Sequence, residues 1–459
     1  MKLASPLLRP VLGFVAGALA LFALTVSPPP AHAQGISFIR DTEAERVLRG
    51  WLDPILIASG LNPQAVHLHI VNDPSLNAFV AEGQNMFLHT GLLMTLETPN
   101  QIMGVMAHET GHMADGHLVR MSAGMRAATV PLLVSMAVGI GAIMAGAGDA
   151  GSAILMGGQQ IAERTFLSFT RTQEAAADQA GMRYLTAIRR SGIGMVQVFK
   201  RFQDQEILSD RRADPFAQSH PASGDRIASL QNLVDASPYR DLRDSPEDQY
   251  ALDMMRAKLR GYIERPEISL RRYPTSDTSK PARYARAMAY FRQPDMTKAL
   301  AEMEGLLKDE PNNPYFLEMY GQIKVEMGRV DEGIIPYQQA VRELPDAPLI
   351  RVALGAAMIG TENPKYHEEA IKELEIALAQ EPDNAFAWYE LAQAYGRKGM
   401  KAKAELATAE RYFAVGAYNS AVQFAGRAQR QLPPASTDWQ RAADIFAIAQ
   451  VQARNQKER

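Results

Sequence analysis

Residues 108–112 read His-Glu-Thr-Gly-His, and this short segment carries the strongest chemical signal in the chain. On a helix, His108 and His112 project from one face about one turn apart, so both imidazoles can bind one Zn²⁺ ion. Glu109 points aside from such an ion and is placed to take a proton from an attacking water molecule. The segment therefore predicts the metal-assisted hydrolysis of a zinc peptidase.

A catalytic zinc ion needs a third protein ligand and an open position. His117, five residues after His112, does not have the spacing of a third ligand, and we expect it beside the site or at the surface. Glu174 and Asp178 form an i, i+4 pair, in which Glu174 would bind zinc and Asp178 would accept the N–H of a ligating histidine. An ordinary solvated acidic face is the alternative, although the alanines between the two acids and Gly181 favour close helix packing.

A buried helix has to position the two histidines. Thr98 is a good N-cap residue, Pro99 suits the first helical position, and Gln101 completes a capping-box pattern. Mostly apolar residues follow, which indicates a helix that is buried on most sides. Further helices are predicted over residues 43–56 and 159–189, and the second of these carries Glu174 and Asp178.

A small sheet is predicted before the histidine-bearing helix. Residues 67–71, 77–81 and 86–89 have the composition of short strands, and residues 82–85 form a turn between the last two. We expect the sheet to be antiparallel. We also expect the strand over residues 86–89 to pair with an extended substrate through backbone hydrogen bonds, which would favour unfolded chains.

Composition excludes several classes of site. The chain of 459 residues has no cysteine, so it has no disulfide, no Cys-ligated zinc and no thiol nucleophile. It is 47% hydrophobic and 22% charged, which is typical of globular proteins, and its length suggests two or three domains. The net charge of −3 shows no basic excess, and we therefore expect no nucleic-acid partner.

The first 33 residues resemble an export signal. Lys2 and Arg9 supply positive charge, residues 11–26 are apolar, and residues 31–33 read Ala-His-Ala, a cleavage-site pattern. We predict a signal peptide that is cleaved after Ala33, with an uncleaved membrane anchor as the alternative. An exported chain without cysteine suits the bacterial periplasm.

The C-terminal part repeats. Pro311 and Pro345 are 34 residues apart, which is the period of tetratricopeptide (TPR) helix–turn–helix units, and Pro382 follows after 37 residues. A longer turn over residues 361–364 accounts for the surplus of three. Residues 438–454 are predicted to form a terminal capping helix. The predicted domains are a signal peptide (1–33), a zinc metallopeptidase domain (34–240), a linker (241–278) and a TPR domain (279–455).

Residues 127–148 contain no charged residue, which raises the question of a membrane span. A single crossing would place the two histidines and Glu174 on opposite sides of the membrane, where they could not share one ion. A second apolar stretch of sufficient length is missing before Glu174, so we expect no complete span. The segment is predicted to be either a mobile lid over the cleft or a hairpin that dips into the inner leaflet of the outer membrane.

Four motifs occur in a fixed order: residues 88–93 (Leu-His-Thr-Gly-Leu-Leu), 108–112, 174–178, and 219–221 (Ser-His-Pro) followed by Arg226. This series resembles the HtpX/CAAX-prenyl-protease family of gluzincins. Its combination with a TPR array behind a signal peptide resembles the periplasmic β-barrel assembly-enhancing proteases. The resemblance implies a mostly α fold, in which a gluzincin metallopeptidase domain of helices with a small β-sheet precedes an α-helical TPR solenoid.

The resemblance also implies roles for individual residues. It assigns one Zn²⁺ ion per chain to three ligands, which are His108, His112 and Glu174. It assigns catalytic roles to Glu109 as general base, to Asp178 and to His220. His220 would occupy the fourth position of the metal in the resting state and keep the enzyme latent. For Arg226 two roles stay open, because it would either orient the His220 loop or stabilise the developing oxyanion.

The function implied by this resemblance is a zinc-dependent endopeptidase of the bacterial periplasm that degrades misassembled outer-membrane proteins and assists their assembly. Its partners would be unfolded or misassembled outer-membrane proteins and, through the TPR array, the β-barrel assembly machinery. Peripheral contact with the outer membrane would run through residues 127–148. The alternative function is a TPR adaptor or chaperone for outer-membrane protein assembly, with latent or minor proteolysis.

Overall fold

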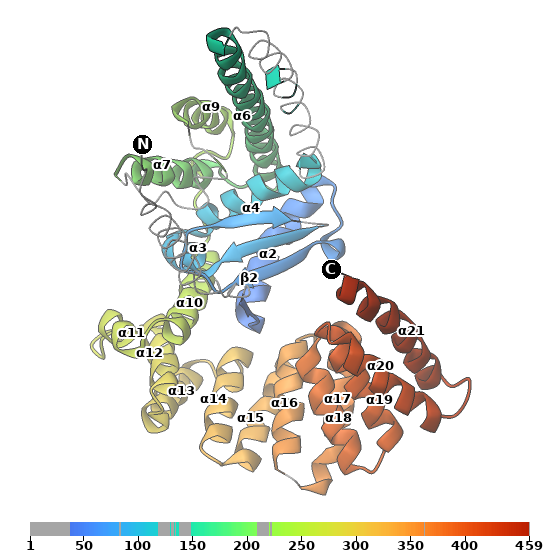
Figure 1. Cartoon of the computed structure of the whole chain (residues 1–459). Coiled ribbons are helices and arrows are strands. Elements are labelled where there is room, and N and C mark those ends of the chain that lie inside the picture. The colour runs from blue at the N-terminus through green and yellow to red at the C-terminus, as the bar shows by residue number, and fades with distance from the viewer. Residues whose placement is uncertain are drawn as a thin grey trace, which may run out of the picture. The chain divides into compact units, whose positions relative to one another are not determined.

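The computed structural model describes residues 37–81, 84–117, 129, 133, 135–136, 148–208, 220, 223–361 and 363–458. The predictions for residues 1–33, and for nearly all of 127–148, lie outside these residues. In the part that is described, helices dominate and a small sheet lies near the N-terminal end, as the mostly α fold class predicts (Figure 1). None of the described helices combines the length and the apolarity that crossing a bilayer would require.

The sheet has four strands in the order β1-β2-β4-β3 and is mixed. Strands β3 and β4 form an antiparallel hairpin, and β2 runs parallel to β4 on its other side, with Ile70 opposite Leu88. The expectation of an antiparallel sheet is therefore wrong for this pair, because β2 and β4 enter the sheet in the same direction. The strands are β1 (Phe38–Ile39), β2 (His67–Val71), β3 (Ala78–Ala81) and β4 (Asn85–His89).

This strand order also corrects the predicted substrate-pairing strand. Because β4 is hydrogen-bonded to β2 on one side and to β3 on the other, residues 86–89 have no free edge for a substrate. Among the described strands, β1 and β3 lie at the two edges of the sheet. An extended substrate that adds to this sheet must therefore pair with one of them.

The histidine-bearing helix α4 (Pro99–Ala114) begins where the sequence predicts. The Thr98 side chain accepts a hydrogen bond from the N–H of Gln101 at 3.3 Å, while the Gln101 carboxamide accepts one from the N–H of Glu97 at 2.7 Å. Every residue from Ile102 to His112 is buried. The helix is hydrophobic on nearly all sides because other elements pack around it.

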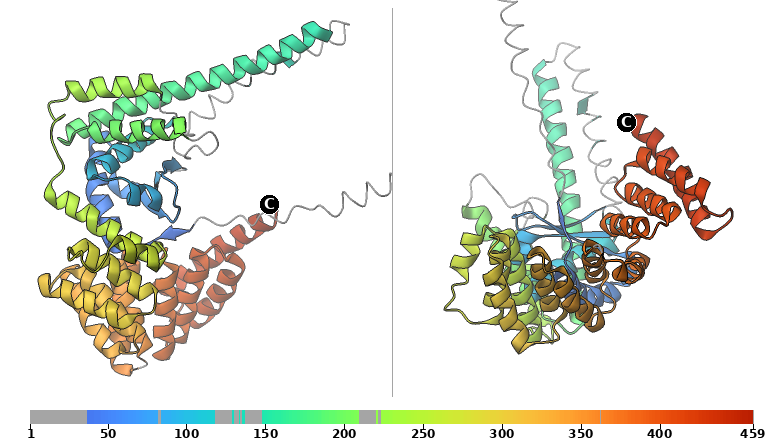
Figure 2. Two further views of the ribbon diagram at one scale, coloured as in Figure 1. Left: turned by 90° about the vertical axis from the view of Figure 1, so that its left-hand side faces the viewer. Right: turned by 90° about the horizontal axis from the view of Figure 1, so that it is seen from below.

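Those elements enclose the metal-binding motif. Helix α4 packs against α2, α6, α7 and strand β3, and α9 packs against α6 and α7 (Figure 1). Figure 2 shows α6 as one long helix, which begins earlier than the predicted residue 159. The helices of this part are α2 (Thr42–Ser59), α3 (Thr90–Thr95), α6 (Gly148–Ala187), α7 (Ile193–Leu208) and α9 (Gly224–Ala236), with a short 3-10 turn, η1 (Pro63–Ala65).

The segment predicted as a linker, residues 241–278, contains two helices, α10 (Pro246–Ile263) and α11 (Pro266–Arg272). Leu252 and Met255 of α10 are buried in the core that includes α4, whereas Met254 packs into the core that includes Tyr284 of α12. Apolar residues on opposite sides of α10 thus join two hydrophobic cores. Residues 241–278 thus connect the parts of the chain before and after them through packed helices.

A buried ionic cluster lies beside α10. Lys258 is 2.5 Å from a carboxylate oxygen of Asp41 and 3.5 Å from one of Glu43, and the Tyr284 hydroxyl donates to Glu43 at 2.9 Å. Burial raises the pKa of Glu43 to about 6, although the nearby Lys258 ammonium opposes the rise. The folded state therefore holds a proton on Glu43 at pH values where the unfolded chain has released it.

This shift predicts a pH-dependent term in stability that the Glu43→Gln variant lacks. Between pH 4.5 and 7 the native state binds more protons at Glu43 than the unfolded state, so the contribution of Glu43 falls by about 2 kcal/mol as pH rises. Urea unfolding at several pH values should show the variant gaining stability relative to wild type across this window. The exposed Glu267→Gln variant is the control, and an equal pH profile for all three proteins would contradict the prediction.

From α12 to the C-terminal end the chain forms successive helix pairs, as the 34-residue period predicts. The longer turn expected near residues 361–364 is present, and the 3-10 turn η2 (Pro364–Tyr366) precedes α17. The helices are α12 (Lys280–Arg292), α13 (Met296–Asp309), α14 (Pro314–Glu326), α15 (Val330–Glu343), α16 (Pro348–Gly360), α17 (His367–Gln380), α18 (Ala385–Arg397), α19 (Lys401–Ala414), α20 (Tyr418–Gln431) and α21 (Thr437–Glu458).

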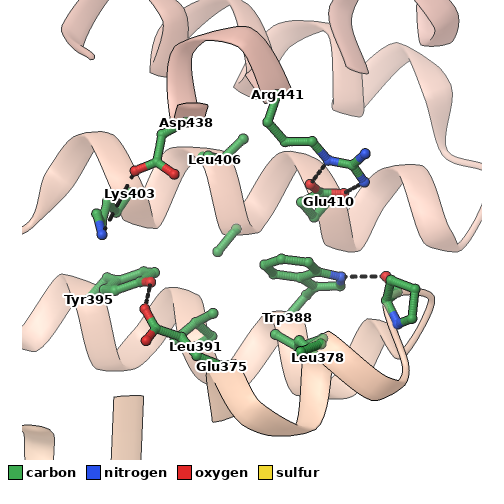
Figure 3. Close-up of a pocket in the computed structure, with 13 residues that line it drawn as sticks. Glu375, Leu378, Trp388, Leu391, Tyr395, Lys403, Leu406, Glu410, Asp438 and Arg441 are labelled. Carbon is green, nitrogen blue, oxygen red and sulfur yellow. Dashed lines mark hydrogen bonds and ion pairs between the residues drawn. The ribbon is translucent and has the colours of Figure 1, made fainter. Parts of the chain in front are cut away.

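A pocket of about 380 Å³ lies among α17, α18, α19 and α21 (Figure 3). The indole N–H of Trp388, which lines it, donates to the carbonyl of Pro382 at 2.8 Å. A second pocket of about 400 Å³ has Leu317 at the equivalent position, 71 residues earlier. In the repeat between them this position is Arg351, which donates to the carbonyl of Pro345 at 3.0 Å. The side chain at this position thus differs from repeat to repeat.

Candidate metal centre

Four buried side chains from three parts of the chain converge: His108 and His112 of α4, Glu174 of α6, and His220, which precedes α9. Nε2 of His108 lies 3.1 Å from Nε2 of His112 and 3.4 Å from Oε2 of Glu174. Nε2 of His112 lies 3.4 Å from Oε1 of Glu174. Ligand atoms at about 2.0–2.2 Å from one tetrahedral ion lie about 3.3–3.6 Å apart, so these separations fit a single metal ion.

His220 lies on the fourth side of this group. Its Nδ1 atom is 3.3 Å from Nε2 of His108 and 3.0 Å from each carboxylate oxygen of Glu174. Its Nε2 atom faces Glu109, 3.5 Å from Oε1. The imidazole of His220 is therefore close enough to the other three side chains to share an ion with them.

Glu109 is buried, with 1% of its surface exposed, and it adjoins the centre without joining the ligand group. Neither of its carboxylate oxygens accepts a well-formed hydrogen bond from any residue that the structure describes. Burial raises the pKa of Glu109 to about 7, while the charges of His108 and His112 oppose the rise. A buried carboxylate without a well-formed hydrogen bond is costly, and a water molecule held at the metal would supply one.

The outer nitrogen of each α4 histidine also has a partner. Nδ1 of His108 lies 2.9 Å from Oδ1 of Asp178, and Nδ1 of His112 lies 2.9 Å from Nδ1 of His117. Such contacts fix the orientation and tautomer of ligating imidazoles. The sequence predicts His117 either beside the site or at the surface, because on a continuous helix its side chain would point away from that of His112. Helix α4 ends at Ala114, however, and the chain then turns through Gly116 at φ 63°, which brings the buried His117 ring back beside His112.

Burial and hydrogen bonding shift the pKa values of the side chains at this centre in opposite directions. Burial lowers the pKa of His108, but hydrogen bonds to Asp178 and Glu174 outweigh this effect and raise it to about 9. Burial raises the pKa of Glu174, yet its hydrogen bonds with His108, His112 and His220 bring it far below the ordinary value. The ionised carboxylate of Glu174 suits a divalent cation, whereas His108 has to release its proton before its imidazole can bind one.

Small residues allow α4 and α6 to approach. A Cβ atom added to Gly111 would lie 2.9 Å from both the Cα and the carbonyl oxygen of Ala177, and one added to Gly181 would lie 3.1 Å from the backbone nitrogen of His108. These helices carry the two histidines and Glu174, respectively. The alanines and glycines around Glu174 thus reflect close packing, as the sequence indicates, and not a solvated acidic face.

Gly111→Ala is accordingly expected to destabilise the protein by about 1–3 kcal/mol, because the added methyl group forces two backbones apart. It should also weaken metal binding, since the candidate ligands lie on α4 and α6. Chemical unfolding and metal titration check both effects. Gly50→Ala is the matched control: this helical glycine has nothing within 4 Å of an added Cβ, and the change should stabilise by up to about 1 kcal/mol. Equal stability of the two variants would contradict the packing argument.

Comparisons with known proteins agree with this geometry. Residues 42–234 match peptidase family M48, and residues 282–348 and 367–421 match tetratricopeptide repeats. The chain is 27% identical over 404 residues to the β-barrel assembly-enhancing protease of Escherichia coli (strain K12), covering 84% of this chain and 79% of that protein. It is 29% identical over 181 residues to metalloprotease LoiP of the same organism, which covers 39% of this chain and 67% of LoiP.

A eukaryotic relative also matches part of the chain. The chain is 28% identical over 194 residues to the mitochondrial metalloendopeptidase OMA1 of Schizosaccharomyces pombe, covering 42% of this chain and 54% of that protein. The family match includes α4, α6 and His220, which supply the converging side chains. The chain is therefore a metallopeptidase in which a peptidase family M48 domain is followed by tetratricopeptide repeats.

Proposed function

We propose that this chain is a zinc-dependent endopeptidase of the bacterial periplasm that degrades misassembled outer-membrane proteins and assists their assembly. One observation carries the proposal: His108, His112, Glu174 and His220 converge beside the buried carboxylate of Glu109, whose oxygens accept no well-formed hydrogen bond from a described residue. The similarity to proteins named β-barrel assembly-enhancing protease supports the choice of substrate and compartment. The absence of cysteine is compatible with an exported chain.

In this proposal zinc is the metal, and His108, His112 and Glu174 are its ligands. The nitrogen and carboxylate donors, without any thiolate, suit a catalytic zinc site with an exchangeable fourth position. A bound zinc ion would supply Lewis acidity to the scissile carbonyl and acidity to the attacking water. Glu109 would accept the proton of that water and pass it to the leaving amine, while Asp178 would hold the Nδ1–H of His108.

We further propose that His220 blocks the fourth position in the resting enzyme. Its Nδ1 atom lies within 3.3 Å of atoms of His108 and Glu174, so its imidazole would compete with water for the ion. Peptide cleavage would then require His220 to withdraw from the ion. A latent enzyme of this kind would spare folded proteins until a substrate displaces the histidine.

The substrate would bind as an added strand on the edge of β3. Strand β3 packs against α4, which carries Glu109. One edge of β3 pairs with β4, and no described strand pairs with its other edge. Backbone pairing of this kind selects extended chains, because folded proteins have already used their backbone hydrogen bonds. The proposal therefore favours unfolded or misassembled polypeptides.

We propose the domain boundaries that the sequence predicts, which are a signal peptide cleaved after Ala33, a peptidase domain over 34–240, a connecting segment over 241–278 and a TPR domain over 279–455. The TPR repeats indicate protein–protein interaction. We propose that they bind the β-barrel assembly machinery, and that residues 127–148 provide any peripheral contact with the outer membrane.

A second candidate function is an adaptor or chaperone whose proteolysis is latent or minor. The pocket in Figure 3 favours it, because the apolar side chains of Leu378, Trp388 and Leu391 line a space of about 380 Å³ that is large enough to receive a side chain of a partner. The two functions can coexist in one chain. Complementation of a deletion strain by the Glu109→Gln variant separates them, since rescue would mean that binding suffices.

The proposed peptidase is tested with an unfolded outer-membrane β-barrel protein as substrate. The zinc-loaded wild type should cleave it slowly, and His220→Ala should cleave it about tenfold faster, because removing a competitor raises the fraction of open sites. A folded soluble protein is the control substrate, and it should stay intact with both enzymes. Failure of both enzymes to cleave the unfolded substrate would overturn the peptidase proposal, whereas equal rates would overturn only the blocking role of His220.

A further inference from the structure

Arg226 joins the two acidic residues of α6. Its side chain is buried, with 8% of its surface exposed, and its Nε and Nη2 atoms each donate to a different oxygen of the Asp178 carboxylate at 2.9 Å. Its Nη1 atom lies 3.1 Å from Oε2 of Glu174. One guanidinium thus contacts two carboxylates and binds one of them through two N–H donors, a bidentate geometry that a planar fork of donors allows and a lysine ammonium does not.

The guanidinium is itself fixed by its surroundings. Its Cζ atom lies 4.9 Å from the centre of the Phe199 ring on α7, and the same ring meets His108 edge-on at 5.4 Å. The N–H of Arg226 donates to the side chain of Ser223, the N-cap residue of α9, at 3.3 Å. Contacts to α6, α7 and the start of α9 therefore hold both the backbone and the side chain of Arg226.

The contacts of Arg226 extend through the Asp178 carboxylate to His108, one of the proposed metal ligands. Oδ1 of Asp178 accepts from Nη2 of Arg226 and lies 2.9 Å from Nδ1 of His108. Glu174 and Asp178 are one helical turn apart, and two buried like charges at that spacing repel each other unless a cation lies between them. Arg226 supplies this cation at the point where both carboxylates must keep a fixed direction.

We propose that Arg226 is the positioning residue of the metal centre: it holds Glu174 toward the ion and holds Asp178 as the acceptor that fixes the tautomer of His108. The inference rests on the proposed metal site and deepens it. It differs from both roles that the sequence left open, which were orienting the His220 loop and stabilising the oxyanion. The donors of Arg226 face the carboxylates of α6, so the residue acts through the metal ligands and does not bind the oxyanion of the substrate.

The test measures zinc affinity, not turnover. Competition of the full-length protein with a chromophoric chelator gives the dissociation constant for Zn²⁺, and circular dichroism confirms the fold of each variant. Arg226→Gln should weaken zinc binding about 10- to 100-fold, as the loss of a residue that orients ligands typically does. Arg226→Lys keeps the charge without the fork and should lie between Arg226→Gln and wild type. Arg183→Gln, an exposed arginine of α6, is the matched control and should bind zinc as wild type does.

A double-mutant cycle with Asp178→Asn distinguishes positioning from a general loss of stability. If Arg226 acts partly through Asp178, the losses of zinc affinity in the two single variants should not multiply in the double variant. If the losses of zinc affinity multiply, Arg226 does not act through Asp178. Wild-type affinity in both Arg226→Gln and Arg226→Lys would overturn the inference while leaving the metal site intact, and where Arg226→Gln does not fold, Arg226→Lys decides. A wild-type protein that binds no zinc would instead overturn the proposed function.

Discussion

Glu109→Gln is expected to lower the rate of peptide cleavage about 10²- to 10⁴-fold while leaving the metal bound, because it removes a general base without removing a ligand. The carboxylate is buried beside the ligand group, and its oxygens have no well-formed hydrogen bond to a described residue. The glutamine amide has nearly the same volume but cannot accept a proton. Initial rates with an unfolded β-barrel substrate, together with the metal content of the purified protein, measure both halves of the prediction.

A glutamate outside the centre provides the matched control for this experiment. Glu97 precedes α4, and its side chain is 75% exposed, so Glu97→Gln makes the same chemical change near the same helix but away from the metal. It should retain wild-type turnover. Substantial cleavage by Glu109→Gln with a full complement of metal would refute the role given to Glu109.

Removal of the metal is expected to abolish cleavage and to destabilise the fold. The side chains that we propose as ligands, together with His220, come from α4, α6 and position 220, so an ion bound only in the folded state would link three segments. At free zinc concentrations of 100 to 1,000 times the dissociation constant, this linkage stabilises by about 3–4 kcal/mol. Thermal or chemical unfolding with and without a chelator measures the difference, and re-addition of zinc should restore it.

His112→Ala should reproduce the metal-free protein in both respects. Its stability should no longer respond to added zinc, because one of the ligands on α4 is missing. His67→Ala, at an exposed position of β2, should respond as wild type does. Zinc-dependent stabilisation of His112→Ala equal to that of wild type would place the ion elsewhere in the molecule.

Local signals were enough to predict the elements that carry the chemistry. The N-cap at Thr98 and the apolar run after it predict α4, and the small residues around Glu174 predict a closely packed α6. The 34-residue spacing from Pro311 to Pro345 predicts the helix pairs of the repeats. Each of these signals depends on residues within a few turns of one another, where helix geometry alone fixes which side chains share a face.

Non-local arrangements were not accessible in the same way. The parallel pairing of β2 with β4 and the internal position of β4 depend on which strands meet, and no short-range pattern specifies that choice. The placement of His117 depends on where α4 stops, which a helical period cannot show. The contacts of Arg226 join residues 48 and 52 positions apart in the sequence, and only the packing of α9 on α6 brings them together.

The most direct test of the central claim is a crystal structure of the zinc-loaded protein with anomalous diffraction measured at the zinc absorption edge. The account predicts one strong anomalous peak per chain, about 2.0–2.2 Å from Nε2 of His108, Nε2 of His112 and a carboxylate oxygen of Glu174. A peak bound by other side chains, or Glu174 remote from an ion held by the two histidines, would contradict it.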